Sequence, residues 1–257
     1  MKHKVKMIAT DLDGTLLRTD KTISEHSKTT LRQCREAGIK VVYATGRGSS
    51  AEMIVPAELF DGRITMNGAI GKINNEEVYR RIIRYQTVRP VLMACDKRGI
   101  SITSENSNMH YSNFVVSDRW PYITDFKVVD FSEHRLDAEK IYIPSPSQED
   151  ITFIKQILPD DLYFLRTVDD EGFLGQIMHR EATKALAVTA LARHWGLSQT
   201  DIVAFGDDFN DIDMISSAGI GVAMENAHDD VKAAADFICS NNDDDGFAEW
   251  LLSNVDI

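Results

Sequence analysis

The sequence predicts an α/β protein built on a Rossmann-like parallel sheet. In the first and last thirds of the chain, apolar β-favouring runs alternate with helical runs, and polar residues follow these runs where each strand ends. Between about 85 and 179 this rhythm stops and short alternating segments take its place, which predicts an inserted α+β module. We therefore expect a core domain of residues 1–84 and 180–257 and a second domain of residues 85–179.

Composition limits the classes of function. The chain has 257 residues, of which 43% are hydrophobic, so it can bury a sizeable core. Its net charge of -12 and pI of about 5.0 disfavour nucleic acid and anionic membranes as partners. The absence of a run of about 18 apolar residues and of a signal-peptide pattern predicts a cytoplasmic protein. Nothing in the pattern predicts an oligomeric state.

The first strand and its loop form the strongest local pattern. An apolar run over 5–9 is followed by Asp11, Asp13, Gly14 and Thr15. Ligands of open α/β sheets bind beyond the carboxyl ends of the strands. One carboxylate at such a place can attack phosphorus, while the second moves a proton to and from the leaving oxygen. Asp-Gly is also a very common turn dipeptide, so this stretch alone is equally compatible with a solvated turn.

The rest of the first third alternates helix and strand. Ser24 is the predicted N-cap of a helix over 26–37, and Gly38 ends that helix. The further elements are a strand over 39–44 that precedes Thr45, Gly46 and Arg47, a helix over 50–59, a strand over 63–70 containing Asn67 and Gly68, and a hairpin over 72–83 with its turn at Asn74 and Asn75.

The inserted module and the last third also contain runs typical of helices and strands. The module is predicted to contain helices over 88–98 and 148–158 and strands over 100–105, 109–113, 140–143, 162–167 and 173–178. The last third is predicted to contain a helix over 181–194, strands over 201–207, 219–224 and 236–240, and a terminal helix over 246–252. The segment NNDDDG before that helix is predicted to be a solvated acidic turn.

The segment GDDFNDIDM places acidic side chains directly after a predicted strand. Carboxylates are hard oxygen ligands that suit Mg²⁺, and Asp207 and Asp211, oriented by Asn210, fit that use. A calcium EF-hand loop is excluded because, counted from Asp207, its glycine position is Ile212 and its glutamate position is Ala218.

Lys184 falls in the first turn of a predicted helix, where a lysine is usually a solvated surface group. Together with two acidic loops at strand ends and the hydroxyl of Thr45, it becomes the cation expected to offset the charge of a phosphoryl group.

Seven stretches carry a resemblance to a known family. They are, in order along the chain, DLDGTLL, ATGR, MNGAI, ATK before an ALAVTAL helix, GDDFNDIDMI, GVAMENAHDDVKAAAD and NNDDDGFAEWL. Together they resemble the haloacid dehalogenase superfamily, and within it the Cof-type (subfamily IIB) phosphatases with an inserted α+β type-B (C2) cap. The resemblance covers nearly the whole predicted core domain.

The resemblance implies catalytic roles for named residues. Asp11 resembles the nucleophile, and Asp13 the acid and base that protonates the leaving oxygen and later activates water. Thr45 and Lys184 resemble the residues that bind the transferring phosphoryl oxygens. Lesser phosphate or substrate contacts are implied for Gly46, Arg47, Asn67 and Asn210.

The resemblance also implies a Mg²⁺ site. An oxygen of Asp11, the backbone carbonyl of Asp13 and the carboxylate of Asp207 would hold the ion. Asp211 would act through water or by fixing Lys184. Asp208 matches a variable position, and a direct metal role is not expected for it.

The implied function is a Mg²⁺-dependent phosphatase that forms an aspartyl-phosphate. Its partner would be a small phosphorylated metabolite such as a sugar phosphate, pyridoxal phosphate or FMN. A phosphosugar mutase and a noncatalytic phosphate-binding regulator are alternatives. The cap would close over the site and select the substrate, and its candidate contacts, each more simply explained by packing or surface position, are Asn113, Arg119, Trp120 and Glu171.

Overall fold

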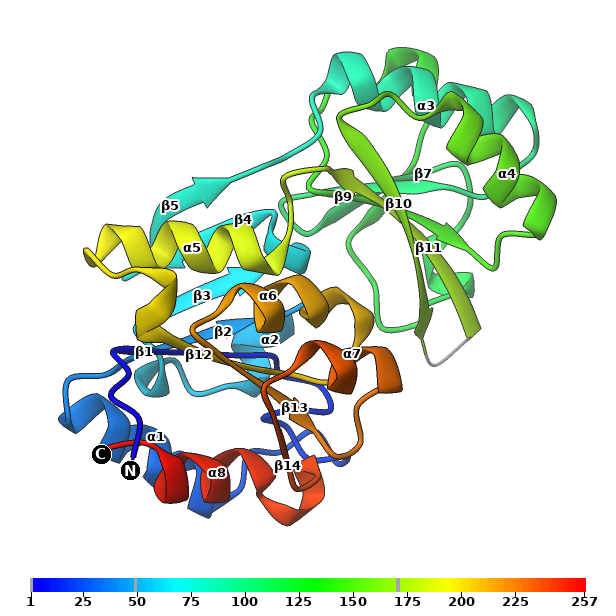
Figure 1. The fold of residues 1–257 in the computed structure, drawn as a ribbon. Helices are drawn as coiled ribbons and strands as arrows, with labels where there is room; N and C mark the ends of the chain where they lie inside the picture. The colour runs from blue at the N-terminus through cyan, green and yellow to red at the C-terminus, as the bar shows by residue number, and fades with distance from the viewer. Residues whose placement is uncertain (1, 49, 170–171) are drawn as a thin grey trace. The chain divides into compact units, whose positions relative to one another are not determined.

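The computed structural model describes residues 2–48, 50–169 and 172–257, which form two compact units (Figure 1). The first unit comprises Met1–Arg80 and Thr183–Ile257, and the second comprises Arg81–Ala182. The assignment of one unit to catalysis and the other to substrate selection stays a prediction. Within the described residues no helix is long and apolar enough to cross a membrane.

The first unit contains an eight-stranded sheet that is parallel through most of its width. Strand β1 (Met7–Thr10) lies at its centre, between β12 (Ile202–Gly206) and β2 (Lys40–Ala44), and pairs with both in parallel. The strand order is β14-β13-β12-β1-β2-β3-β4-β5, in which the remaining strands are β13 (Ile220–Met224), β14 (Phe237–Cys239), β3 (Gly62–Thr65), β4 (Ile70–Ile73) and β5 (Glu76–Arg80). The predicted Rossmann-like core is confirmed.

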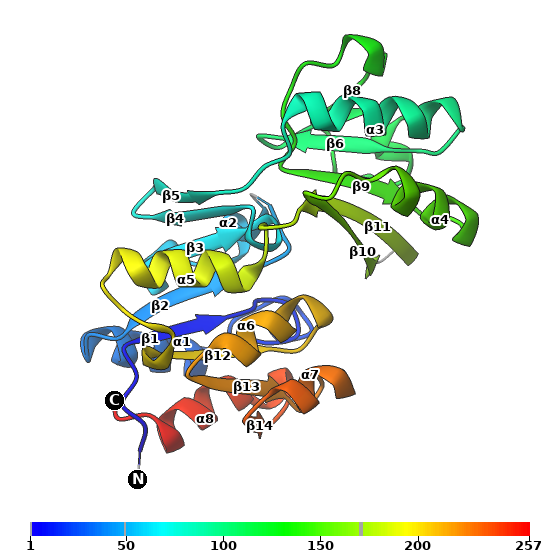
Figure 2. The same ribbon diagram turned by 45° about the horizontal axis from the view of Figure 1, so that its top comes forward.

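Alternating side chains of the central strands serve two cores. Ile8 and Val41 belong to the core on the side of α1 (Glu25–Glu36) and α8 (Gly246–Asn254). Met7 and Val42, one residue away on the same strands, belong to the core beneath α5 (Lys184–His194). Figures 1 and 2 show these helices on opposite faces of the sheet. A central strand buried on both faces explains why its sequence is a continuous apolar run.

The helix predicted over 50–59 is wrong in its length. Helix α2 spans only Ser50–Ile54, and a separate 3-10 turn spans Ala57–Leu59. Pro56 lies between them with an extended backbone, because a proline cannot donate the hydrogen bond that would continue the helix and restricts the residue before it. The other short helices are α6 (Ile212–Ser217) and α7 (Asp229–Ala234).

The strand predicted over 63–70 is also wrong in its length. Strand β3 ends at Thr65, and Met66–Gly68 form a 3-10 turn from which β4 returns antiparallel to β3. The backbone φ is 53° at both Met66 and Asn67 and 99° at Gly68, so the chain turns through left-handed conformations. A Cβ at Gly68 would lie 2.2 Å from the carbonyl of Thr183, so this turn packs directly against the start of α5.

Helix α5 begins at Lys184, three residues later than predicted. The side chain of Thr183 caps it by accepting a hydrogen bond of 3.2 Å from the backbone N–H of Leu186. Lys184 is therefore the first helical residue. Its side chain begins at the edge of the sheet where the loops that follow the strands lie.

The acidic segment 241–246 is only partly a solvated turn. Asn242 is buried and donates to the carbonyl of Leu17 at 2.9 Å, and Asp245 pairs with Arg18 at 2.8 Å. The prediction of a solvated turn is wrong for these two residues, because they hold the loop that follows β1.

The second unit contains a six-stranded sheet with two helices packed on one face. Helix α3 (Tyr85–Lys97) and helix α4 (Gln148–Ile157) share a core with this sheet. The strand order is β10-β11-β9-β6-β7-β8, with β10 (Leu162–Asp169), β11 (Gly172–His179), β9 (Lys140–Pro144), β6 (Thr103–Asn106), β7 (Met109–Ser112) and β8 (Phe126–Val128). The sequence did not predict β8, which has three residues with no buried side chain among them.

We predict that Gly68→Ala destabilises the fold more than Gly38→Ala does. Both glycines have positive φ, so either alanine costs about 1–2 kcal/mol in backbone energy. Nothing lies within 4 Å of a Cβ at Gly38, whereas at Gly68 the backbone of Thr183 must also move. Free energies of unfolding from denaturant titrations measure the difference. Equal losses for the two variants would contradict the contact between the turn and α5.

Candidate active site

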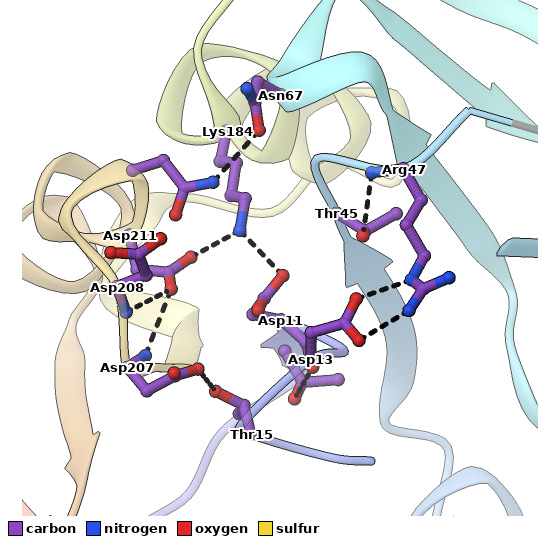
Figure 3. Close-up of polar contacts among 12 residues, drawn as sticks. Asp11, Asp13, Thr15, Thr45, Arg47, Asn67, Lys184, Asp207, Asp208 and Asp211 are labelled. Carbon is purple, nitrogen blue, oxygen red and sulfur yellow. Dashed lines mark hydrogen bonds and ion pairs between the residues drawn. The ribbon is translucent and has the colours of Figure 1, made fainter. Parts of the chain in front are cut away.

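The polar side chains of the site meet at one edge of the first sheet. Asp11 follows β1, Thr45 follows β2 and Asp207 follows β12, and because these strands are parallel their carboxyl ends lie at the same edge. Lys184 reaches this edge from the start of α5 (Figure 3). Side chains far apart in the sequence thereby come within hydrogen-bond distance.

Lys184 is the centre of the site. Its ammonium Nζ donates to Asp11 Oδ1 and to Asp211 Oδ1, each at 2.7 Å, and its side chain is 1% exposed (Figure 3). The usual surface role of a lysine in a first helical turn is therefore excluded. Burial alone would lower the pKa of Lys184, but the two carboxylates outweigh it and raise that pKa, so the ammonium stays charged.

Three carboxylates surround this one ammonium. Asp11, Asp207 and Asp211, which we call the carboxylate cluster, place one oxygen each within 4.8 Å of one another. Burial and the neighbouring carboxylates raise the pKa of Asp11 well above its ordinary value, although Lys184 acts against them. Burial and repulsion from Asp211 also raise the pKa of Asp207, to about 7. The cluster therefore carries more negative charge than Lys184 offsets.

Asp207 and Asp211 are held by hydrogen bonds to neighbouring residues and to the turn after β1. The hydroxyl of Thr15 donates to Asp207 Oδ1 at 2.6 Å, and a Cβ at Gly14 would fall 2.3 Å from the other oxygen of that carboxylate. Asp211 Oδ2 accepts from the backbone N–H groups of Asp207 and Asp208 at 3.1 Å each. The DGT turn thus fits around Asp207, a role for Thr15 that the sequence did not predict.

Asp13 lies among cations. Arg47 binds it with two bonds, from Nε to Oδ2 at 2.5 Å and from Nη2 to Oδ1 at 2.7 Å, and Lys21 Nζ donates to Oδ1 at 2.9 Å (Figure 3 draws Arg47). Burial would raise the pKa of Asp13, but its bonds to Arg47 and Lys21 outweigh burial and lower that pKa. Only a lesser contact was predicted for Arg47, and no role was predicted for Lys21.

The remaining predicted residues line the loop after β2. The hydroxyl of Thr45 accepts from the backbone N–H of Arg47 at 3.1 Å. Asn210 Nδ2 donates to Asn67 Oδ1 at 3.0 Å, and a Cβ at Gly46 would lie 2.7 Å from that same oxygen. Gly46 therefore allows the loop to approach the pair of amides. The structure brings all the predicted site residues to this edge of the sheet, and their roles stay predictions.

The structure describes three of the four residues predicted as candidate cap contacts. Asn113 bonds within its own unit, accepting from Ile102 N at 2.9 Å and donating to Asp96 Oδ1 at 2.9 Å. Trp120 is buried in a small apolar cluster, and the guanidinium of Arg119 lies 5.5 Å from its ring. These contacts agree with packing roles for Asn113 and Trp120. Glu171 lies outside the described residues.

A family comparison agrees with this geometry. Residues 8–251 match the model of the haloacid dehalogenase-like hydrolases. The chain belongs to this family. Members named phosphatases match it over nearly their full length, and this haloacid dehalogenase-like hydrolase is accordingly a phosphatase that acts on small phosphate esters.

Three similar proteins illustrate the relationship. A 5-amino-6-(5-phospho-D-ribitylamino)uracil phosphatase of Bacillus subtilis is 30% identical, with 96% of each chain covered. The structure of a phosphatase of the haloalkanoate (HAD) superfamily from Bacteroides thetaiotaomicron has a TM-score of 0.86 at 26% identity, covering 98% of this chain and 95% of that one. A HAD subclass IIB sugar phosphatase has a TM-score of 0.77 at 26% identity, covering 96% and 98%. The predicted subclass is confirmed.

We predict that Asp207 makes the metal-free protein lose stability as pH rises from about 4 to about 7. The pKa of Asp207 is raised to about 7 from an ordinary 3.8, so between these values the folded state binds more protons than the unfolded state. Measured in chelator, the Tm of the wild type should fall relative to that of Asp207→Asn as pH rises across this range. The same dependence of Tm on pH in both proteins would contradict the charge excess of the carboxylate cluster.

Proposed function

We propose that this phosphatase transfers the phosphoryl group to Asp11 and then to water, with Mg²⁺ as its cofactor. The observation that carries the proposal is the buried ammonium of Lys184 on Asp11, beside Asp207 and Asp211. A carboxylate nucleophile needs both an ionised state and a neighbour that offsets the negative charge of the phosphate. Lys184 supplies the first positive charge, while Thr45 adds a hydroxyl at the next strand end.

The donor set of the carboxylate cluster fits Mg²⁺. Its donors are hard carboxylate oxygens, and the raised pKa values of Asp11 and Asp207 are the response expected where one further positive charge is missing. Asp11, Asp207 and the backbone carbonyl of Asp13 would hold the ion, and Asp211 would act mainly by fixing Lys184. When bound, the ion offsets negative charge at the phosphoryl group.

Asp13 is proposed to move the proton. Its low pKa, due to Arg47 and Lys21, suits the second step, in which a carboxylate takes a proton from the attacking water. In the first step the same group must carry a proton to the leaving oxygen. That requires its bonds to Arg47 and Lys21 to loosen when an ester binds, since burial then raises its pKa.

The other site residues are proposed to shape the phosphoryl pocket. Gly46 and Arg47 belong to the loop after β2, and Asn67 and Asn210 form the amide pair beside it. A half-buried amide pair can hold a loop at a fixed distance from the phosphoryl group, and phosphoryl transfer depends mainly on such positioning. A cytoplasmic location stays a prediction.

We predict that Asp11→Asn lowers phosphate release from an aryl phosphate about a thousandfold or more, because the amide is no nucleophile. Removal of divalent metal with a chelator should have a comparable effect that added Mg²⁺ reverses. Phosphate release with Mg²⁺ measures both.

The matched control is Asp208→Asn, which changes a half-exposed acid of the same loop that caps the next turn. It should retain turnover within about threefold, because asparagine is an equally good cap. Turnover that survives Asp11→Asn, or that falls equally in both variants, would contradict the proposed role of Asp11.

A further inference from the structure

One hydrogen bond ties the DGT turn (residues 13–15) to the segment that follows β13. Asn226 Nδ2 donates to the backbone carbonyl of Gly14 at 2.7 Å. Asn226 belongs to the stretch GVAMENAHDDVKAAAD, which supplies none of the residues in the proposed mechanism. The other end of its side chain is also held, because Asn226 Oδ1 accepts from the backbone N–H of Asn242 at 3.1 Å. The amide therefore has a defined partner at each end, and the DGT turn is one of them.

The same segment contacts the loop of Asp207. The backbone N–H of His228 donates to the carbonyl of Asp207 at 3.2 Å. Ala227, the residue before His228, is buried in the core on the side of α1 and α8, which holds this short segment in place. Residues 226–228 therefore connect two loops, one that carries Asp13 and one that carries Asp207. Both loops supply ligands to the proposed Mg²⁺ site.

Gly14 needs a restraint from outside the turn. Its φ is 76°, and because glycine populates both signs of φ about equally, sterics alone do not keep the backbone in this conformation. A larger residue is excluded, since a Cβ at Gly14 would lie 2.3 Å from Asp207 Oδ2. The missing side chain lets the Asp207 carboxylate approach but leaves the backbone free to rotate. The hydrogen bond from Asn226 opposes that rotation.

The carbonyl of Asp13 is fixed through Gly14. It lies in the planar peptide group between Asp13 and Gly14, and the φ angle of Gly14 sets how that plane is turned relative to the carbonyl of Gly14. Asn226 holds the Gly14 carbonyl, while the carboxylate of Asp207 packs against the Cα of Gly14. Under the proposed function the Asp13 carbonyl is a Mg²⁺ ligand. Asn226 therefore acts on a ligand one residue away from its own hydrogen bond.

We propose that Asn226 is a positioning residue for the Mg²⁺ site and gives that site its preference for Mg²⁺ over Ca²⁺. Mg²⁺ demands nearly ideal octahedral coordination with bonds of about 2.1 Å, whereas Ca²⁺ accepts bonds of about 2.4 Å and irregular geometry. A carbonyl held at a fixed separation from the Asp207 carboxylate suits Mg²⁺, and a carbonyl on a loose turn also admits Ca²⁺. The inference rests on the proposed function and adds the residue that sets metal selectivity.

The test measures metal binding directly, by isothermal titration calorimetry of the substrate-free protein with MgCl₂ and with CaCl₂. Asn226→Ala removes the bond to Gly14. The matched control is Asn242→Ala, because Asn242 Nδ2 donates to the backbone carbonyl of Leu17 at 2.9 Å in the same loop. Each variant loses a bond from a side-chain amide to a backbone carbonyl of this loop, but only Asn226 bonds the DGT turn. Free energies of unfolding in chelator show how far each variant is destabilised.

In Asn226→Ala the Kd for Mg²⁺ should rise about three- to tenfold, which is the order of one hydrogen bond, and the Kd for Ca²⁺ should rise less. Asn242→Ala should leave both Kd values unchanged even where it lowers stability. An unchanged Kd for Mg²⁺ in Asn226→Ala, an equal rise for Ca²⁺, or an equal rise in Asn242→Ala would overturn the inference while the proposed Mg²⁺ site stands. Absence of Mg²⁺ binding by the wild type would overturn both.

Discussion

The buried ion network of Lys184 is the interaction on which the site depends. Removing a charged group from water costs several kcal/mol, and this ammonium is stabilised by its two carboxylate partners, Asp11 and Asp211. Asp11 extends β1, Asp211 follows β12 and Lys184 begins α5, so the network fixes three elements at one sheet edge. The turn at Gly68 then determines where α5 can start. The packing of the core and the positions of the site residues therefore depend on the same contacts.

The two sides of the site differ in their charged partners. On the phosphoryl side the carboxylate cluster outnumbers Lys184, which favours a metal ion there. On the other side Arg47 and Lys21 bind the carboxylate of Asp13. Phosphoryl transfer moves negative charge from the nucleophile towards the leaving oxygen, so under the proposed role of Asp13 these cations stand on the side where that charge develops.

The rule that polar residues directly after parallel strands lie at one edge of the sheet predicted much of this site. The rule places Asp11, Thr45 and Asp207 at one edge, because parallel strands share the direction in which they end. The rule did not predict the burial of Lys184 or the early end of β3. Both depend on the close approach of Gly68 to the backbone of Thr183, which no local pattern indicates. The contact of Lys21 with Asp13 was equally hidden. It needs a left-handed residue and a loop held by the distant segment 241–246, whose acidic sequence alone indicates only a solvated turn.

The central claim is covalent transfer to Asp11, and mass spectrometry of an acid-quenched reaction tests it most directly. In Asp13→Asn protein with Mg²⁺ and an aryl phosphate, whose leaving group needs no proton, the first step should proceed while the second lacks its base. A peptide containing Asp11 should then gain the mass of HPO₃. Release of phosphate without any such adduct, or an adduct on another residue, would contradict the account.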